Sequence, residues 1–142
     1  MTISARWSEV SWPVKAGGAT LAICVVAAIS AAAYWSISAQ RENAVAEALT
    51  GGDPMKAPGL VRRYGCGGCH TISAIAGADG KVAAPLDALR KRVYIGGVLQ
   101  NTPDNLVRWI ASPRAFSPQT AMPDTGINEA EARHVAALLY RH

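Results

Sequence analysis

The stretch "YGCGGCH", residues 64–70, holds two of the chain's three cysteines and one of its three histidines. Two cysteines separated by two residues occur in redox dithiols, in zinc sites and in disulfide-linked turns. A histidine directly after the second cysteine adds a fourth possibility, the covalent attachment of a c-type haem. Each of these chemistries needs a different surrounding fold, so the rest of the chain decides between them.

Upstream of this stretch lies a long uncharged run. Residues 16–39 contain no charged side chain, and a helix of that length covers about 36 Å, enough to cross the ~30 Å hydrocarbon layer. We expect a single-pass transmembrane signal anchor at 16–39. Arg6 and Lys15 precede the run and only Arg41 follows it closely, so residues 1–15 should stay in the cytoplasm. A cleaved signal peptide is the alternative, but this run exceeds the usual apolar length of 7–15 residues.

The charge balance points away from nucleic acid. The net charge is +4, and residues 41–142 hold twelve Lys and Arg against nine Asp and Glu. This part of the sequence carries no basic stripe interleaved with aromatic residues, which nucleic-acid binding would favour. Cys24 lies inside the apolar run, where a cysteine serves as a small apolar side chain.

The sequence of residues 40–142 predicts short helices joined by loops. Residues 40–54 should form a helical extension that stops at Gly51, followed by a linker, and residues 55–142 the globular domain. Brief helices are expected before Cys66 and from Leu86, with a loop over residues 71–84. No alternating strand pattern is evident. The fold class is therefore all-α, with an N-terminal transmembrane helix.

Two later helices carry clear start signals. Thr102 is a good N-cap, Pro103 suits the first helical position, and a proline ends that helix. Asn128 with Glu131 three residues later predicts a capping box at the start of the last helix. His134 on that helix is expected at the surface.

The alternatives for the cysteine pair can now be weighed. A thioredoxin-like dithiol needs a βαβ context, and no strand signal precedes Tyr64. A structural zinc ion needs four ligands, whereas Cys66, Cys69 and His70 supply three at most. A disulfide remains open, because an exported domain allows oxidation. One covalent haem c, with Cys66 and Cys69 as anchors and His70 as an iron ligand, best suits a loop-rich helical domain of this size.

A second iron ligand can be sought among the methionines. The chain has only Met1, Met55 and Met122. Met1 lies across the membrane, and Met55 is too close to Cys66 in sequence to reach the opposite haem face. Met122 lies in "SPQTAMPDTGI", between two prolines that stiffen the loop. We therefore expect Met122 as the distal axial ligand, the type that raises a haem's reduction potential.

Four stretches carry a family resemblance: "YGCGGCHTI", "YIGGVLQNTPDNLVRWIASP", "AMPDTGI" and "EARHVAALL". Over roughly residues 59–139 the chain resembles the class I c-type cytochromes. More narrowly, it is similar to the cytochrome domain attached to subunit II of haem-c-containing cytochrome oxidases. The resemblance implies the class I cytochrome c fold, short helices and loops around one haem.

The resemblance also implies roles for further residues. Arg92 and Trp109 stand where such domains hydrogen-bond the haem propionates, and Leu86 stands at the haem edge. The family usually has Gly-Pro where this chain has Ala83 and Ala84. The carbonyl of Ala84 can still accept a hydrogen bond from His70, which would fix the histidine's tautomer.

The expected function is single-electron transfer rather than catalysis. A membrane-anchored monohaem cytochrome would take electrons from a quinol-oxidising complex and pass them towards a terminal oxidase. Its haem domain would lie in the periplasm, on the bacterial inner membrane, and it would bind neither a small-molecule substrate nor nucleic acid. One alternative is a fixed haem c subunit of an oxidase or dehydrogenase complex. The other is a haem enzyme with a labile sixth ligand.

Overall fold

The computed structural model describes residues 12–141, with the backbone alone for residues 12–17. Most of the expected cytoplasmic segment 1–15 therefore lies outside the described residues. The chain is mostly helical, with 57% helix and 5% strand. It divides into two compact units, Met1–Ala39 and Gln40–His142.

The first helix, α1, spans Trp12–Thr50. Its Gly18–Thr50 part has a mean hydropathy of 1.9 and is long and apolar enough to cross a membrane. Leu21, Ile29 and Trp35 on this helix expose between 63% and 71% of their surface. Large apolar side chains exposed over this part of the helix are compatible with an apolar surrounding such as a bilayer. The helix ends where predicted, because Gly51 adopts φ +69°, a left-handed conformation typical of helix C-termini.

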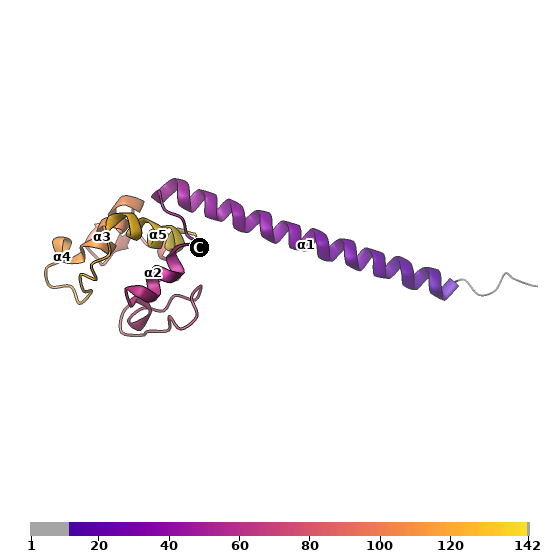
Figure 1. Cartoon of the computed structure of the whole chain (residues 1–142), viewed down its shortest axis with the longest axis horizontal. Coiled ribbons are helices and arrows are strands. Elements are labelled where there is room, and N and C mark those ends of the chain that lie inside the picture. Colours follow the sequence, from indigo (N-terminus) through magenta and orange to yellow (C-terminus); the bar gives the residue numbers. More distant parts are fainter. Residues whose placement is uncertain (1–11, 142) are drawn as a thin grey trace, which may run out of the picture. The chain divides into compact units, whose positions relative to one another are not determined.

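The globular unit is built mainly from four further helices (Figure 1). They are α2 (Ala57–Arg63), α3 (Pro103–Ala111), α4 (Pro113–Phe116) and α5 (Glu129–Tyr140). Two 3₁₀ turns, η1 (Cys66–Gly68) and η2 (Leu89–Lys91), lie in the loops between α2 and α3. Helix α5 packs against both α2 and α3. The core therefore lies around α5.

The predicted helix starts of α3 and α5 are confirmed. The side-chain hydroxyl of Thr102 accepts a hydrogen bond from the backbone N–H of Asn105, and Pro103 is the first residue of α3. Asn128 and Glu131 form the predicted capping box at α5. These caps satisfy N–H groups that the helix itself leaves unpaired.

Small residues let the helices of the core approach closely. Ala57, Ala132 and Ala136 are completely buried, and Val61 is 1% exposed. Aliphatic side chains from the loops and from α3 complete the cluster, including Ile72, Leu106 and Ile127. The core therefore draws its side chains from the helices and from the loops between them.

Two local predictions were wrong. The first is the short helix from Leu86, which is reduced to η2 because Ala88 adopts φ +55° and Asp87 accepts hydrogen bonds from Ser73 instead. The second is the absence of strands. A two-residue antiparallel pair, β1 (Tyr94–Ile95) and β2 (Leu99–Gln100), closes a hairpin. Its turn uses Gly96 and Gly97, both at positive φ, as tight hairpin turns require.

Candidate functional site

The CGGCH segment follows directly from the end of α2. Gly65 adopts φ +68°, which turns the chain out of the helix and into η1. The backbone N–H groups of Cys69 and His70 both donate to the carbonyl of Cys66, at 3.3 and 3.0 Å. This turn fixes the spacing of the two cysteines and brings His70 directly after them.

The two cysteine side chains lie in different environments. Cys66 is half-buried and Cys69 is exposed, and both are free thiols. Burial raises the pKa of the Cys66 thiol above its ordinary value. A reactive redox dithiol needs a lowered thiol pKa, so the surroundings of Cys66 do not favour that chemistry.

The segment 78–86 runs alongside the CGGCH segment and holds it. Gly80 N–H donates to the carbonyl of Gly67 at 3.0 Å, and Ala83 N–H donates to that of Cys69 at 2.9 Å. Further along, Leu86 N–H donates to the carbonyl of Thr71 at 2.8 Å. These bonds fix the backbone on both sides of His70.

His70 makes the hydrogen bond predicted for it. Its ring nitrogen Nδ1 lies 2.7 Å from the carbonyl oxygen of Ala84. A carbonyl only accepts, so Nδ1 carries the proton and Nε2 keeps its lone pair. Among the described residues Nε2 has no hydrogen-bond partner. The imidazole is therefore oriented and left with one free ligating nitrogen, the arrangement usual for metal-bound histidines.

Two glycines are required by the close contact between these segments. A Cβ added at Gly67 would lie 2.8 Å from Cα and Cβ of Ala78, and one at Gly80 would lie 2.5 Å from the carbonyl group of Gly68. Real Cβ atoms essentially never come this close to other heavy atoms. Gly68 differs, because a Cβ there would meet nothing within 4 Å.

Arg92 and Leu86 support the same loop. The guanidinium Nη2 of Arg92 donates to the carbonyl of Pro85, the residue after the His70 acceptor. The half-buried Leu86 packs against the core and lines a hollow of about 20 Å³ with Ile72 and residues of α5. Both residues thus lie close in sequence and in space to the histidine's backbone partner.

Trp109 is a core residue of α3. It is 8% exposed, and a Cβ added at Gly96 would lie 2.5 Å from its ring. The indole is therefore packed against the turn of the β1–β2 hairpin. Asn101 ties that hairpin to the core, because its amide donates to the carbonyls of Leu89 and Arg92 and accepts from Tyr140.

The two methionines within the described residues lie in different environments. Met122 is half-buried and packs against the core, and its N–H donates to the hydroxyl of Thr120 at 3.3 Å. Met55 is 68% exposed, and its sulfur lies 3.9 Å from the amide nitrogen of Asn43. Met122 is thus the methionine that belongs to the globular core.

Apolar side chains lie exposed in the loops next to the CGGCH segment and on the hairpin. Val82 is 83% exposed, Val93 72%, Tyr94 56% and Val98 49%. Val82 directly precedes Ala83 and Ala84, which hydrogen-bond Cys69 and His70.

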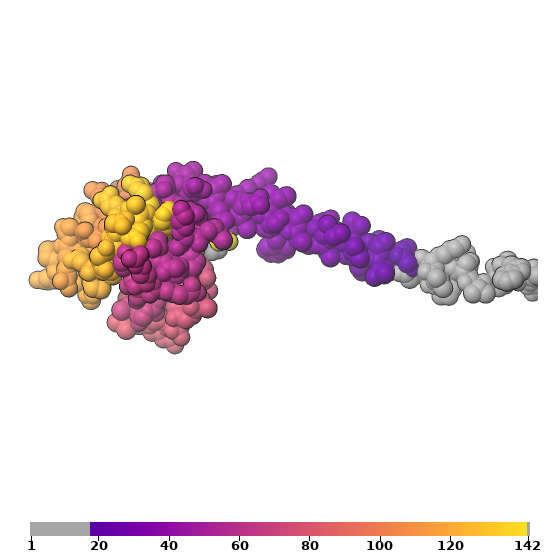
Figure 2. All heavy atoms as spheres, viewed as in Figure 1, coloured from indigo at the N-terminus to yellow at the C-terminus, as the bar shows by residue number. Residues whose placement is uncertain are grey.

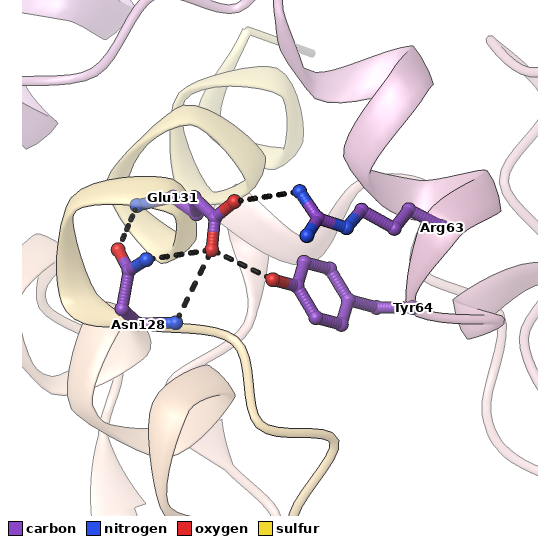
Figure 3. Close-up of polar contacts among 4 residues, drawn as sticks. All are labelled: Arg63, Tyr64, Asn128 and Glu131. Carbon is purple, nitrogen blue, oxygen red and sulfur yellow. Dashed lines mark hydrogen bonds and ion pairs between the residues drawn. The ribbon is translucent and has the colours of Figure 1, made fainter.

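A hydrogen-bonded cluster around the Glu131 carboxylate was not expected from the sequence (Figure 3). The Glu131 carboxylate accepts hydrogen bonds from the Tyr64 hydroxyl at 2.7 Å and from the Asn128 side-chain amide at 2.7 Å. It also pairs with Arg63 at 3.3 Å. The cluster links the end of α2, two residues before Cys66, to the start of α5. The capping-box pattern predicts the role of Glu131 at the start of α5. No pattern in the sequence predicts Tyr64 as its hydrogen-bond partner.

The Tyr64–Glu131 hydrogen bond predicts a pH-dependent stability. It lowers the pKa of Glu131 and raises that of Tyr64. The contribution of Glu131 should be fully present at neutral pH and lost as the pH falls below about 4.3, through the lowered folded value. Thermal unfolding of Tyr64→Phe should show a lower Tm than the wild type at pH 7, and this difference should shrink on acidification.

Tyr140→Phe is the matched control for Tyr64→Phe. It removes a hydroxyl that donates to the Asn101 amide oxygen at 2.8 Å, an acceptor that does not titrate. Its Tm difference from the wild type should therefore keep its size where that of Tyr64→Phe shrinks. Equal acid dependence of the two differences would contradict the assignment to Glu131.

The prediction that His134 lies at the surface was wrong. The side chain is half-buried, and its Nδ1 accepts a hydrogen bond from the backbone N–H of Asp53 at 2.8 Å. The sequence places these residues 81 positions apart, so no local pattern could have shown the contact.

A structural zinc site finds no further ligands. Among the residues whose side chains the structure describes, no three His, Cys, Asp or Glu side chains converge to hold a metal ion. Comparison with models of protein families, with curated proteins and with solved structures gives no match.

Proposed function

We propose that this chain is a membrane-anchored c-type cytochrome with one covalent haem, which passes single electrons along a respiratory chain towards a terminal oxidase. The observation that carries the proposal is the CGGCH turn with His70 oriented by the Ala84 carbonyl. A histidine held in this way, directly after two unpaired cysteines, suits one haem c better than a redox dithiol, a zinc ion or a disulfide.

Each ligand-bearing residue has a defined task in this proposal. The Cys66 and Cys69 thiols would form thioethers to the haem, and Nε2 of His70 and the Met122 sulfur would ligate its iron. The bound haem supplies one-electron redox chemistry. The Ala84 carbonyl keeps the proton on Nδ1, so Nε2 stays available. Pro118 and Pro123 stiffen the loop that carries Met122.

The exposed apolar side chains fit this cofactor. Val82, Val93, Tyr94 and Val98 would cover part of the porphyrin and exclude water from it. Burying them would also remove an apolar surface that is costly to leave in water. Arg92 and Trp109 are proposed donors to the propionates, since both side chains carry N–H groups.

The fold and the location follow from the same proposal. Helices α2, α3 and α5 would form the class I cytochrome c fold, with the haem-binding turn following α2 and α5 packed on both other helices. Helix α1 would cross the bacterial inner membrane and place the globular unit in the periplasm. The electron donor would be a quinol-oxidising complex.

The decisive experiment is covalent haem attachment. The full chain would be produced in a bacterium with a c-type cytochrome maturation system, and haem stain would be read on a denaturing gel beside a redox spectrum. The wild type and Cys24→Ala should stain equally, whereas Cys66→Ala/Cys69→Ala should lose the stain completely. An unstained wild-type protein, with normal yield and an intact anchor, would refute the proposal.

A further inference from the structure

The carbonyl group that orients His70 belongs to an exposed part of the chain. Ala84 and Pro85 are both exposed, and residues 83–88 form no regular helix or strand. Figure 2 shows the pink atoms of this part of the chain at the surface, beside the magenta atoms that precede them in the sequence. Packing of the Ala84 side chain therefore does little to fix its carbonyl, and hydrogen bonds from neighbouring residues must do so.

Backbone hydrogen bonds join this part of the chain to the CGGCH segment on both sides of Ala84. The Ala83 N–H donates to the Cys69 carbonyl at 2.9 Å, and the Leu86 N–H donates to the Thr71 carbonyl at 2.8 Å. Both members of the second pair come later in the sequence than those of the first, so the two strips of backbone run in the same direction. The hydrogen bond between the histidine ring and the Ala84 carbonyl lies between these two pairs.

A two-fold contact between Ser73 and Asp87 continues this pairing. The Asp87 carboxylate accepts hydrogen bonds from the Ser73 backbone N–H at 2.9 Å and from the Ser73 hydroxyl at 2.8 Å. Ser73 lies three residues after His70, and Asp87 lies three residues after Ala84. We call this pair the Ser73–Asp87 clamp. Because its acceptor is a carboxylate, both bonds are stronger than those to a neutral oxygen.

The backbone directly after the clamp has a conformation that it would not adopt by itself. Ala88 has φ +55° and is the one residue other than glycine with a positive φ in the part of the chain that the structure describes. A side chain makes this left-handed conformation unfavourable, so surrounding contacts must hold it. The carboxylate of the preceding residue, Asp87, makes two of these contacts. Without the clamp we expect residues 84–88 to relax to another conformation.

We propose that the Ser73–Asp87 clamp positions the Ala84 carbonyl, and thereby sets how strongly Nε2 of His70 donates to the haem iron. The inference rests on the proposed function. A firm hydrogen bond from Nδ1 makes an imidazole a more basic ligand. A more basic ligand stabilises ferric iron more than ferrous iron, so the clamp keeps the reduction potential lower than a relaxed loop would. Ser73 and Asp87 act through the Ala84 carbonyl and are therefore positioning residues.

Exchange of the His70 Nδ1 proton with solvent tests the positioning directly. In the reduced, diamagnetic haem protein this proton can be followed by NMR, and its exchange should be on the order of tenfold faster in Ser73→Ala and Asp87→Ala than in the wild type. Ser73→Thr keeps the hydroxyl and should restore the wild-type rate. Both residues are exposed, so these variants should fold. Equal exchange rates in all four proteins would overturn the proposal.

The reduction potential tests the consequence for the haem, with Asp79→Ala as the matched control. Asp79 is exposed, pairs with Thr71 through the backbone, and its carboxylate makes no hydrogen bond to the described residues. Asp79→Ala removes the same charge as Asp87→Ala. At a fixed potential, the ratio of ferrous to ferric haem should rise on the order of tenfold in Asp87→Ala and several-fold in the uncharged Ser73→Ala, and little in Asp79→Ala. Equal shifts in both aspartate variants, with none in Ser73→Ala, would be a charge effect and would overturn the proposal.

Failure of the proposed function would look different, because no protein in the series, the wild type included, would then stain for haem. The clamp is still tested in that case, since the ¹⁵N shifts of the His70 ring in the haem-free protein report which nitrogen carries the proton. A mixture of tautomers in Ser73→Ala and Asp87→Ala, beside a single Nδ1–H form in the wild type and Asp79→Ala, would support the clamp. The same tautomer in every protein would overturn it.

Discussion

In the proposed cytochrome, the Met122→Ala variant should keep the covalent haem but lose the thioether ligand. Its reduction potential should fall by on the order of 0.1 V, a fraction of the ~0.8 V range that axial ligands span. A thioether favours the ferrous state, and alanine offers no atom to replace it. The variant should also lose the absorption band of the methionine–iron bond. Reduced protein should then bind carbon monoxide, which the wild type should not.

Met55→Ala is the matched control for this variant. Met55 is 68% exposed and its sulfur lies near Asn43 in α1, so its removal should leave the potential and the spectrum as in the wild type. A wild-type protein that binds carbon monoxide readily would contradict Met122 as a ligand. It would favour a haem enzyme with a labile sixth position instead.

Local chemistry explains which features were predictable from the sequence. The caps at Thr102 and Asn128 depend on atoms within three residues of each other, so the pattern alone was enough. The same holds for the helix end at Gly51 and for the long apolar helix. The bond between His70 and Ala84 spans 14 residues, and it was predictable only through the resemblance to a family.

The features that were missed depend on contacts between distant segments. The cluster of Tyr64 and Glu131 spans 67 residues, and the contact of Asp53 with His134 spans 81. Side chains that pair across such distances follow no periodic pattern, because the pairing is set by how α5 packs on the rest of the unit. The β1–β2 hairpin was missed for another reason, since strands of two residues are too short to alternate visibly.

The two glycines inside CGGCH also differ through a contact that the local sequence does not show. By sequence, Gly67 and Gly68 look equivalent, as small residues between two cysteines. In the structure only Gly67 lies against a neighbouring backbone, with Ala78 at 2.8 Å from the position of an added Cβ. Neither glycine has a positive φ, so any difference between their alanine variants must come from this contact.

Gly67→Ala should therefore destabilise the globular unit by about 1–3 kcal/mol, the usual cost of overpacking, and reduce the yield of covalent haem protein. The methyl group would push η1 away from the segment 78–86, and the hydrogen bond between Gly80 and Gly67 would be lost or lengthened. Since the same segment carries the Ala84 acceptor of His70, the histidine would lose part of its orientation.

Gly68→Ala provides the comparison, because it adds the same methyl group one residue further along the same turn. A Cβ at Gly68 meets nothing within 4 Å, so this variant should unfold at nearly the wild-type denaturant concentration and stain for haem at nearly the wild-type level. Equal losses of stability and haem stain in the two variants would mean that the backbone conformation of the turn disfavours any side chain, whatever that side chain contacts. A loss confined to Gly67→Ala would identify the contact with Ala78 as the feature that holds the cysteines and His70 in position.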